Sequence, residues 1–199
     1  MIHPPTVMTA HNLALEKLLD GNRRYQVAKQ VYPHQTAARR HALRDGQKPF
    51  ALILSCADSR VPPELIFDQG LGDLFVIRVA GHAVDDTVLA SVEFAVLLLD
   101  VSLVMVLGHS QCGAVEAACG GGELPGNMSK LVTTIQPAVA AAKKLPGDLA
   151  ENAVKTNAKM TAEKLLVRSS LLRQSASDDQ VKIVVALYTL DTGVVELLT

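Results

Sequence analysis

The chain has 199 residues, a formal net charge of −1 and 49% hydrophobic residues. This size and apolar content predict one globular domain over residues 1–199 and exclude a disordered chain. The balanced charge gives no reason to expect nucleic acid or an anionic membrane surface as a partner. Three cysteines without a paired framework favour a reducing compartment, in which thiols stay available for metal.

The sequence shows neither a secretory signal nor a membrane-spanning stretch, so we expect a soluble, cytoplasmic protein with no membrane partner. Met1–Pro5 has neither the basic nor the apolar region of a secretory signal. The most apolar stretch, Phe94–Leu107, is interrupted by Asp100 and Ser102 and is shorter than the roughly 20 residues that a helix needs to cross a bilayer.

Residues 1–46 are predicted to form a helical arm. Leucines at helical spacing predict a helix over Thr9–Lys29 with Thr9 as its N-cap, and a second short helix is expected over Gln35–Arg44. An arm of this kind has no core of its own. It therefore packs either on its own chain or on a neighbouring subunit.

The remainder, residues 47–199, alternates apolar strands with helices. The expected strands are 50–55, 74–79, 101–107, 181–188 and 194–198, and the expected helices are 64–67, 87–99, 112–118, 129–144 and 148–173. This order predicts an α/β fold in which helices flank a mostly parallel central sheet. The last two strands, joined through Asp191–Gly193, are expected to form a C-terminal hairpin or strand extension.

Two of these strands lead into metal-ligand residues. Cys56 follows the first strand, and His109 and Cys112 follow the third. The carboxyl ends of neighbouring parallel strands meet at one edge of a sheet, so the three side chains are expected to converge. Two thiolates and one imidazole suit zinc, and three ligands leave the fourth position open, as catalytic zinc requires. On the residues alone, buried structural thiols beside a surface ion pair are an equally good interpretation.

Asp58 and Arg60 lie two and four residues beyond Cys56. If this segment is extended, the three side chains face the same way, and Arg60 can hold Asp58 ionised beside the metal. His82, further along the chain, is either a proton shuttle near the cleft or, as we favour, a structural histidine.

Four linked motifs resemble those of the β-class carbonic anhydrases. They are Cys56-Ala-Asp58-Ser-Arg60-Val-Pro, Gly72-Asp-Leu-Phe75-Val-Ile-Arg78, Ser91-Val-Glu93-Phe94-Ala and Gly108-His109-Ser-Gln-Cys112-Gly113. The resemblance implies a zinc enzyme in which a zinc-bound hydroxide attacks CO2 to give bicarbonate and a proton. It makes Cys56, His109 and Cys112 the zinc ligands, and it makes Asp58 and Arg60 the catalytic pair that orients the hydroxide.

The resemblance also implies a substrate cleft shared between subunits. Gln47, Phe75 and Phe94 fall at positions that line the cleft across a dimer interface in plant-type members, and Gly113 matches a further substrate-binding position. Phe94 stands where those members carry Tyr, so a hydroxyl contact is lost while the aromatic wall remains. The expected assembly is a homodimer, with a tetramer as the alternative.

In another branch of the family the aspartate closes the site by binding zinc, with the help of a Trp three residues before the first Cys. Ile53 occupies that position here, and the chain has no Trp, so we predict an open site. Two thiolates make the zinc-bound water less acidic than neutral ligands do. Activity is therefore expected to rise toward alkaline pH.

Other functions remain as alternatives. One is a zinc hydrolase that acts on a CO2-like molecule such as carbon disulfide. Another is a non-catalytic, zinc-stabilised module that binds a partner, against which the Asp58/Arg60 pair argues. A third is a thiol redox protein, although Cys56 and Cys112 lack a C-x-x-C spacing.

Overall fold

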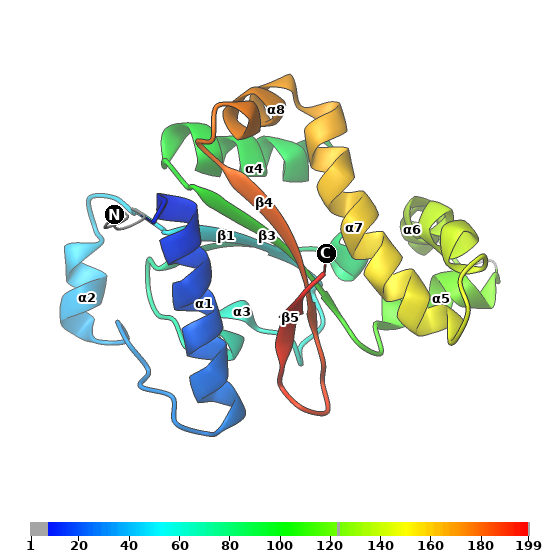
Figure 1. The fold of residues 1–199 in the computed structure, drawn as a ribbon, viewed down its shortest axis with the longest axis horizontal. Coiled ribbons are helices and arrows are strands. Elements are labelled where there is room, and N and C mark those ends of the chain that lie inside the picture. Colours follow the sequence, from blue (N-terminus) through cyan, green and yellow to red (C-terminus); the bar gives the residue numbers. More distant parts are fainter. Residues whose placement is uncertain (1–7, 123, 199) are drawn as a thin grey trace, which may run out of the picture.

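A five-stranded sheet forms the centre of the computed structural model, which describes residues 8–122 and 124–198 (Figure 1). Its strands are β1 (Ala51–Ser55), β2 (Leu74–Arg78), β3 (Leu103–His109), β4 (Lys182–Tyr188) and β5 (Val195–Leu197). They lie in the order β2-β1-β3-β4-β5, with every neighbouring pair parallel except the antiparallel β4 and β5. The predicted α/β fold and its C-terminal hairpin are therefore confirmed.

Helices cover both faces of this sheet, which is why its central strands are fully buried. One face packs against α1 (Ala10–Gln26) and α3 (Pro63–Ile66), and the other against α4 (Asp86–Leu98), α7 (Leu149–Arg168) and α8 (Ser170–Ser177). Side chains alternate between the two cores along β1, since Ile53 belongs to the first core, whereas Leu52 and Leu54 belong to the second. The apolar runs of the sequence are thus strands buried on both faces.

A third apolar cluster lies beyond the carboxyl ends of the strands. It is built by α5 (Gly113–Gly120), α6 (Met128–Ala142) and one end of α7, and it includes Cys56 and Cys112. The short η1 (Ala80–His82) lies between this cluster and the end of β2. Among residues 8–122 and 124–198, none of the helices has the length and apolarity that crossing a bilayer requires.

The N-terminal arm divides into two parts. Helix α1 packs on its own chain, where Leu18 is fully buried and Asn22 donates hydrogen bonds to the carbonyls of Ile66 and Gly193. Helix α2 (Ala37–Ala42) has no buried residue among those described. Packing on the same chain, the alternative left open by the sequence, therefore holds for α1.

The expected single helix over 148–173 is wrong, because it breaks at Ser169 into α7 and α8. Ser169 has an extended backbone, and its hydroxyl accepts the N–H of Leu172 and so caps α8. The same hydroxyl donates to the carboxylate of Glu93 on α4. A capping serine with a partner in a distant helix ends α7 at a position where the local sequence shows no Gly or Pro.

Candidate metal centre

The strand order places a crevice between β1 and β3. The chain runs from β1 outward to β2 and then returns to the other side of β1 to form β3. In open α/β sheets, ligands bind outside the carboxyl ends of the strands at such a switch point. Cys56 follows the last residue of β1, and His109 is the last residue of β3.

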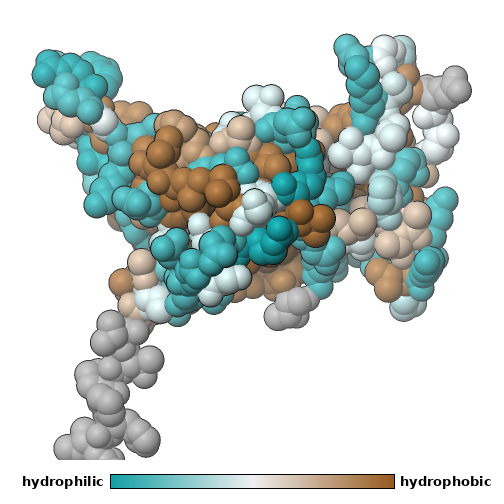
Figure 2. Space-filling model, turned by 90° about the horizontal axis from the view of Figure 1, so that it is seen from above, coloured by the Kyte–Doolittle hydropathy of each residue, from teal (hydrophilic) through white to brown (hydrophobic). Residues whose placement is uncertain are grey.

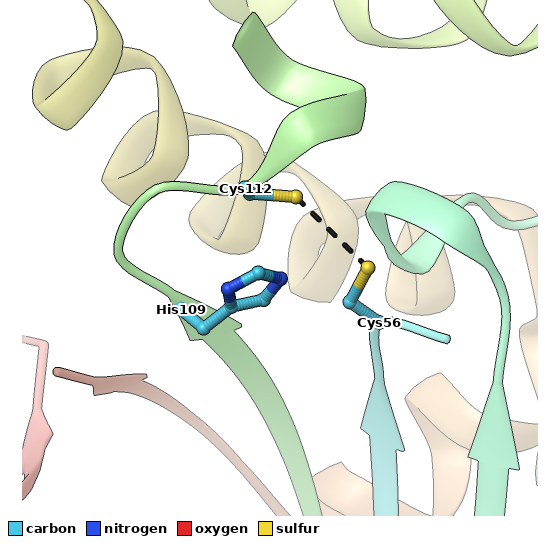
Figure 3. A group of neighbouring side chains, drawn as sticks. All are labelled: Cys56, His109 and Cys112. Carbon is cyan, nitrogen blue, oxygen red and sulfur yellow. Dashed lines mark hydrogen bonds between the residues drawn. The ribbon is translucent and has the colours of Figure 1, made fainter. Parts of the chain in front are cut away.

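Cys56, His109 and Cys112 meet at this switch point (Figure 3). One ligand atom from each residue lies within 4.8 Å of the others, and all three side chains are buried. Cys112 directly precedes α5, and its Sγ atom lies 3.9 Å from that of Cys56. The structure thus brings together the three metal ligands that the sequence predicts.

The imidazole of His109 is prepared to bind a metal through one nitrogen. Its Nδ1 lies 2.9 Å from the backbone carbonyl of Ser110, which can only accept, so Nδ1 carries the proton. Nε2 is buried and has no hydrogen-bond partner within the described part of the chain. A fixed tautomer with an unpaired inner nitrogen is the usual state of a metal-binding histidine, so the donor set fits a metal ion.

The two thiols share a proton unequally. The hydrogen bond from Cys112 lowers the pKa of Cys56, and the backbone N–H of Gly81, at 3.3 Å from Sγ, lowers it further. The pKa of Cys112 is raised, because its proton is donated to Cys56 and because the thiol is buried. Metal ligation requires both thiolates, so binding of a metal would release the proton of Cys112.

Asp58 and Arg60 form a bidentate pair beside the cluster. The Nε and Nη2 atoms of Arg60 lie 3.0 and 2.7 Å from the two carboxylate oxygens. These hydrogen bonds hold the pKa of Asp58 well below its usual range. One carboxylate oxygen also lies 3.9 Å from Nε2 of His109, which places an ionised acceptor next to the metal-binding atoms.

The segment that carries this pair is a turn, so the extended conformation that the sequence analysis considered does not occur. The N–H of Val61 donates to the carbonyl of Asp58, and the N–H of Arg60 donates to the Asp58 carboxylate at 2.9 Å. Aspartate commonly closes turns in this way. The turn, rather than the alternation of a strand, brings the two charged side chains together.

Three hydrogen bonds from two arginines, which the sequence does not predict, hold the ligand-bearing loops in place. Arg78, the last residue of β2, donates to the carbonyls of both Cys56 and Asp58. Arg60 reaches the carbonyl of Gln111 at 3.1 Å and so ties the first loop to the second. The sequence feature that could have indicated the role of Arg78 is its position as a single charged residue at the end of an apolar strand.

The expected substrate-binding residues divide between the two ends of the sheet. Gly113 lies at the start of α5 beside Cys112, and a Cβ added there would meet no atom within 4 Å. Gln47 precedes β1 and is exposed, so β1 alone separates it from Cys56 by roughly 16 Å. Phe75 and Phe94 contact each other, with ring centroids 6.3 Å apart, but they lie away from the metal cluster of the same chain.

The sheet topology and the three-ligand cluster define an α/β protein with a candidate catalytic metal site. Within the described residues, the cluster has three ligands, and both Asp58 oxygens are engaged by Arg60. Ile53 is fully buried in β1, three residues before Cys56.

Comparisons with known proteins identify the family of this chain. The carbonic anhydrase family model matches residues 51–195. Carbonic anhydrase 2 of Mycobacterium tuberculosis is 40% identical over 184 residues, which cover 90% of this chain and 89% of that protein. A carbonic anhydrase of Mycolicibacterium smegmatis is 39% identical over 188 residues, which cover 92% and 91% of the two chains. The chain therefore belongs to the carbonic anhydrase family.

Solved structures identify the class within that family. The β-carbonic anhydrase CcaA superposes with a TM-score of 0.74 at 25% identity, over 93% of this chain and 95% of that one. Tetrameric β-carbonic anhydrases from Sordaria macrospora share the fold, with a TM-score of 0.71 at 23% identity over 94% and 97% of the two chains. The predicted resemblance to the β class is confirmed.

Proposed function

We propose that this protein is a zinc-dependent carbonic anhydrase that catalyses the reversible hydration of CO2 to bicarbonate and a proton. The observation that carries the proposal is the Cys56–His109–Cys112 cluster, with an arginine-held aspartate 3.9 Å from its histidine. The 40% identity to a named carbonic anhydrase over 90% of the chain supports the same reaction.

Cys56, His109 and Cys112 would hold the zinc ion and set the net charge of the centre. Zinc bound there would act as a Lewis acid that lets water supply hydroxide near neutral pH. His109 contributes Nε2, because the Ser110 carbonyl keeps the proton on Nδ1. The two thiolates lower the net positive charge of the centre more than neutral ligands would. We therefore propose that turnover rises toward alkaline pH.

Asp58 orients the nucleophile. An ionised carboxylate can only accept hydrogen bonds, so Asp58 accepts a hydrogen bond from the attacking hydroxyl group. This bond orients the hydroxyl group so that a lone pair of its oxygen points at the carbon of CO2. Arg60 keeps the carboxylate ionised and fixes its plane through two hydrogen bonds. Gly113 leaves open space beside the ligands, where a substrate can approach.

We propose that the substrate pocket is completed by a second copy of the chain in a homodimer. CO2 carries no charge and forms few hydrogen bonds, so its pocket needs an apolar wall. Phe75 and Phe94 can supply such a wall only to another copy, since they lie away from the metal residues of their own chain. Figure 2 shows hydrophobic side chains gathered on the side of the molecule that carries α4, where Phe94, Leu97 and Leu98 are exposed.

Stopped-flow measurement of CO2 hydration from pH 7 to 9, normalised to zinc bound per chain, tests the proposal. Fast turnover that rises with pH is expected, and Cys56→Ser should lower it about a thousand-fold or more, because the Lewis acid supplies several kcal/mol. Cys119→Ser is the matched control, since Cys119 lies outside the cluster.

The negative outcome of this experiment also has a defined meaning. Stoichiometric zinc without turnover at any pH from 7 to 9 would contradict the proposed reaction. Product analysis with carbon disulfide would then distinguish a related hydrolase from a zinc-stabilised binding module.

A further inference from the structure

A chain of buried hydrogen bonds links helix α7 to the thiol of Cys56. The backbone N–H of Gly81 donates to Cys56 Sγ at 3.3 Å. The carbonyl of Gly81 accepts from Asn157 Nδ2 at 3.0 Å, and the same nitrogen lies 3.0 Å from Nε2 of His82. Asn157 and His82 are 4% and 1% exposed, so water does not compete for these bonds.

The direction of each bond follows from the chemistry of the partners. The Gly81 carbonyl can only accept, so the Asn157 atom that faces it is the NH2 group. The NH2 group of Asn157 can only donate hydrogen bonds. Nε2 of His82 is therefore unprotonated and accepts the second hydrogen of that NH2 group. His82 is therefore neutral, in agreement with a pKa that burial lowers to about 4.

This arrangement argues against a proton shuttle and for a structural clamp. Nε2 of His82 is occupied by Asn157, and Nδ1 is buried with no partner within the described part of the chain. Neither nitrogen has a route to solvent, which a shuttle requires. The histidine instead accepts the amide that holds Gly81.

Gly81 holds a backbone conformation that other residues rarely adopt. Gly81 has a left-handed φ of +60°, and a Cβ there would lie 2.7 Å from Ile135 Cδ1.

Asparagine is a poor helix former, and burying its amide has a cost unless the amide is hydrogen-bonded. The position of Asn157 in the buried face of α7 is therefore explained by the two acceptors that it serves.

We propose that Asn157 is a positioning residue for the metal ligand Cys56. It holds the carbonyl of Gly81 and so limits rotation about this residue, which keeps the N–H on the other side of its Cα pointed at Cys56 Sγ. This N–H bond sets how much charge the thiolate gives to the metal. The proposal rests on the proposed metal site. It assigns no contact between Asn157 and the metal or the substrate.

Cobalt(II) substitution gives a test that does not depend on turnover. Without the Gly81 hydrogen bond the sulfur electrons lie higher in energy, so the thiolate-to-cobalt absorption band should move to longer wavelength. Metal affinity, measured by competition with a chelator, should fall roughly 10- to 100-fold, as expected when a bond that orients a ligand is lost. Because a stronger thiolate donor makes water less acidic, the midpoint of the pH profile for CO2 hydration should shift to higher pH.

Two substitutions separate the hydrogen bond from packing. Asn157→Leu removes the donor but keeps most of the volume, whereas Asn157→Ala removes both and favours the helix. Both should give the shifted band and the weaker affinity. Asn152→Ala is the matched control, because Asn152 also lies on α7 and donates to a backbone carbonyl, that of Pro146, but has no link to Cys56. His82→Gln, which keeps an acceptor for Asn157, should retain a band close to that of the wild type.

The outcomes separate this inference from the proposed function. A wild-type band with unchanged affinity in folded Asn157→Leu and Asn157→Ala would overturn the positioning role and leave the metal site intact. A shift in the alanine variant alone would mean that Asn157 only fills space. If wild-type protein shows no thiolate-to-cobalt band at all, the metal site itself is wrong, and the inference is overturned with it.

Discussion

The two ends of the parallel sheet are built in different ways. At the carboxyl end, Cys56, His109 and Cys112 are buried, and hydrogen bonds within the chain fix the groups around them. Toward the amino end, Gln47 is exposed and Phe94 is 46% exposed. The metal-ligand groups thus find their hydrogen-bond partners within one chain, whereas Gln47 and Phe94, which are expected to line the substrate pocket, are exposed at its surface.

The proposed function accounts for this difference. A metal ligand or an ionised carboxylate works only if its hydrogen bonds fix its position, and such bonds form most reliably within one folded chain. An apolar wall for an uncharged substrate needs only shape and exclusion of water, which a second copy can provide. Substitutions at the carboxyl end should therefore act on chemistry, and those at the amino end on assembly.

Asp58→Asn should have the largest effect of the substitutions that keep the metal ligands. Asparagine preserves the size of the side chain but presents an N–H where the carboxylate accepts, so kcat should fall roughly 10²- to 10⁴-fold, the range for a lost proton-handling group. Zinc content, measured by elemental analysis, should stay at the wild-type level. Asp45→Asn is the matched control, since Asp45 also pairs with an arginine but is 85% exposed and lies before β1, at the other end of that strand from Cys56.

The carboxyl end is also the part that the sequence predicts best. Cys56 and His109 come at the ends of apolar runs, and the parallel order of such strands requires that the two residues meet. The chain order of the ligands thus predicts that they converge, but it leaves buried structural thiols as an equally good interpretation, and the resemblance to the β class favours the metal site. The spacing from Cys56 also predicts the pairing of Asp58 with Arg60, to which the resemblance assigns a catalytic role. The structure places Asp58 beside Nε2 of His109 and pairs it with Arg60.

What the sequence does not predict depends on partners distant in the chain. Asn157 lies 76 residues from Gly81, and only the packing of α7 brings the two together. The break at Ser169 is a similar case, because its hydroxyl is held by Glu93 of another helix. Local propensity contains neither partner, so helix boundaries and supporting hydrogen bonds require the folded structure.

Phe94→Arg should test the amino end. A charged side chain in an apolar contact between two copies should weaken dimerisation by on the order of 2 kcal/mol, or about 30-fold, as expected for a residue near the centre of an interface. Sedimentation equilibrium measures the effect, and CO2 hydration should fall at protein concentrations at which the dimer dissociates. Leu145→Arg is the control, because Leu145 is 51% exposed but lies in the turn after α6. Unchanged association in Phe94→Arg would rule out this face as the contact.

The last prediction is a gradual effect, an acid sensitivity of the carboxyl end. Burial lowers the pKa of His82 to about 4, from an ordinary value of 6.5, so the unfolded chain takes up this proton first as the pH falls. The contribution of neutral His82 to stability is therefore complete above pH 6.5 and is lost as the pH falls from 6.5 toward 4, with a slope of at most about 1.4 kcal/mol per pH unit. The pKa of Asp58 is lowered by Arg60, so its contribution is lost only below its ordinary value of 3.8. The lowered pKa of Cys56 also reduces stability as the pH falls through this range, so the effect of His82 is the difference between the wild type and His82→Gln.

Urea unfolding of the chelator-treated protein at pH 7, 6 and 5 measures that slope. His82→Gln removes the titrating group, so the loss of stability per pH unit should be smaller by up to one proton in this variant. His41→Gln is the matched control for replacing a histidine, because His41 lies exposed on α2 and not among the buried hydrogen bonds behind Cys56. An equal slope in His82→Gln and the wild type would mean that acid acts elsewhere. A smaller slope would instead locate the acid-sensitive step in the buried hydrogen bonds behind Cys56, and not in the exposed arm.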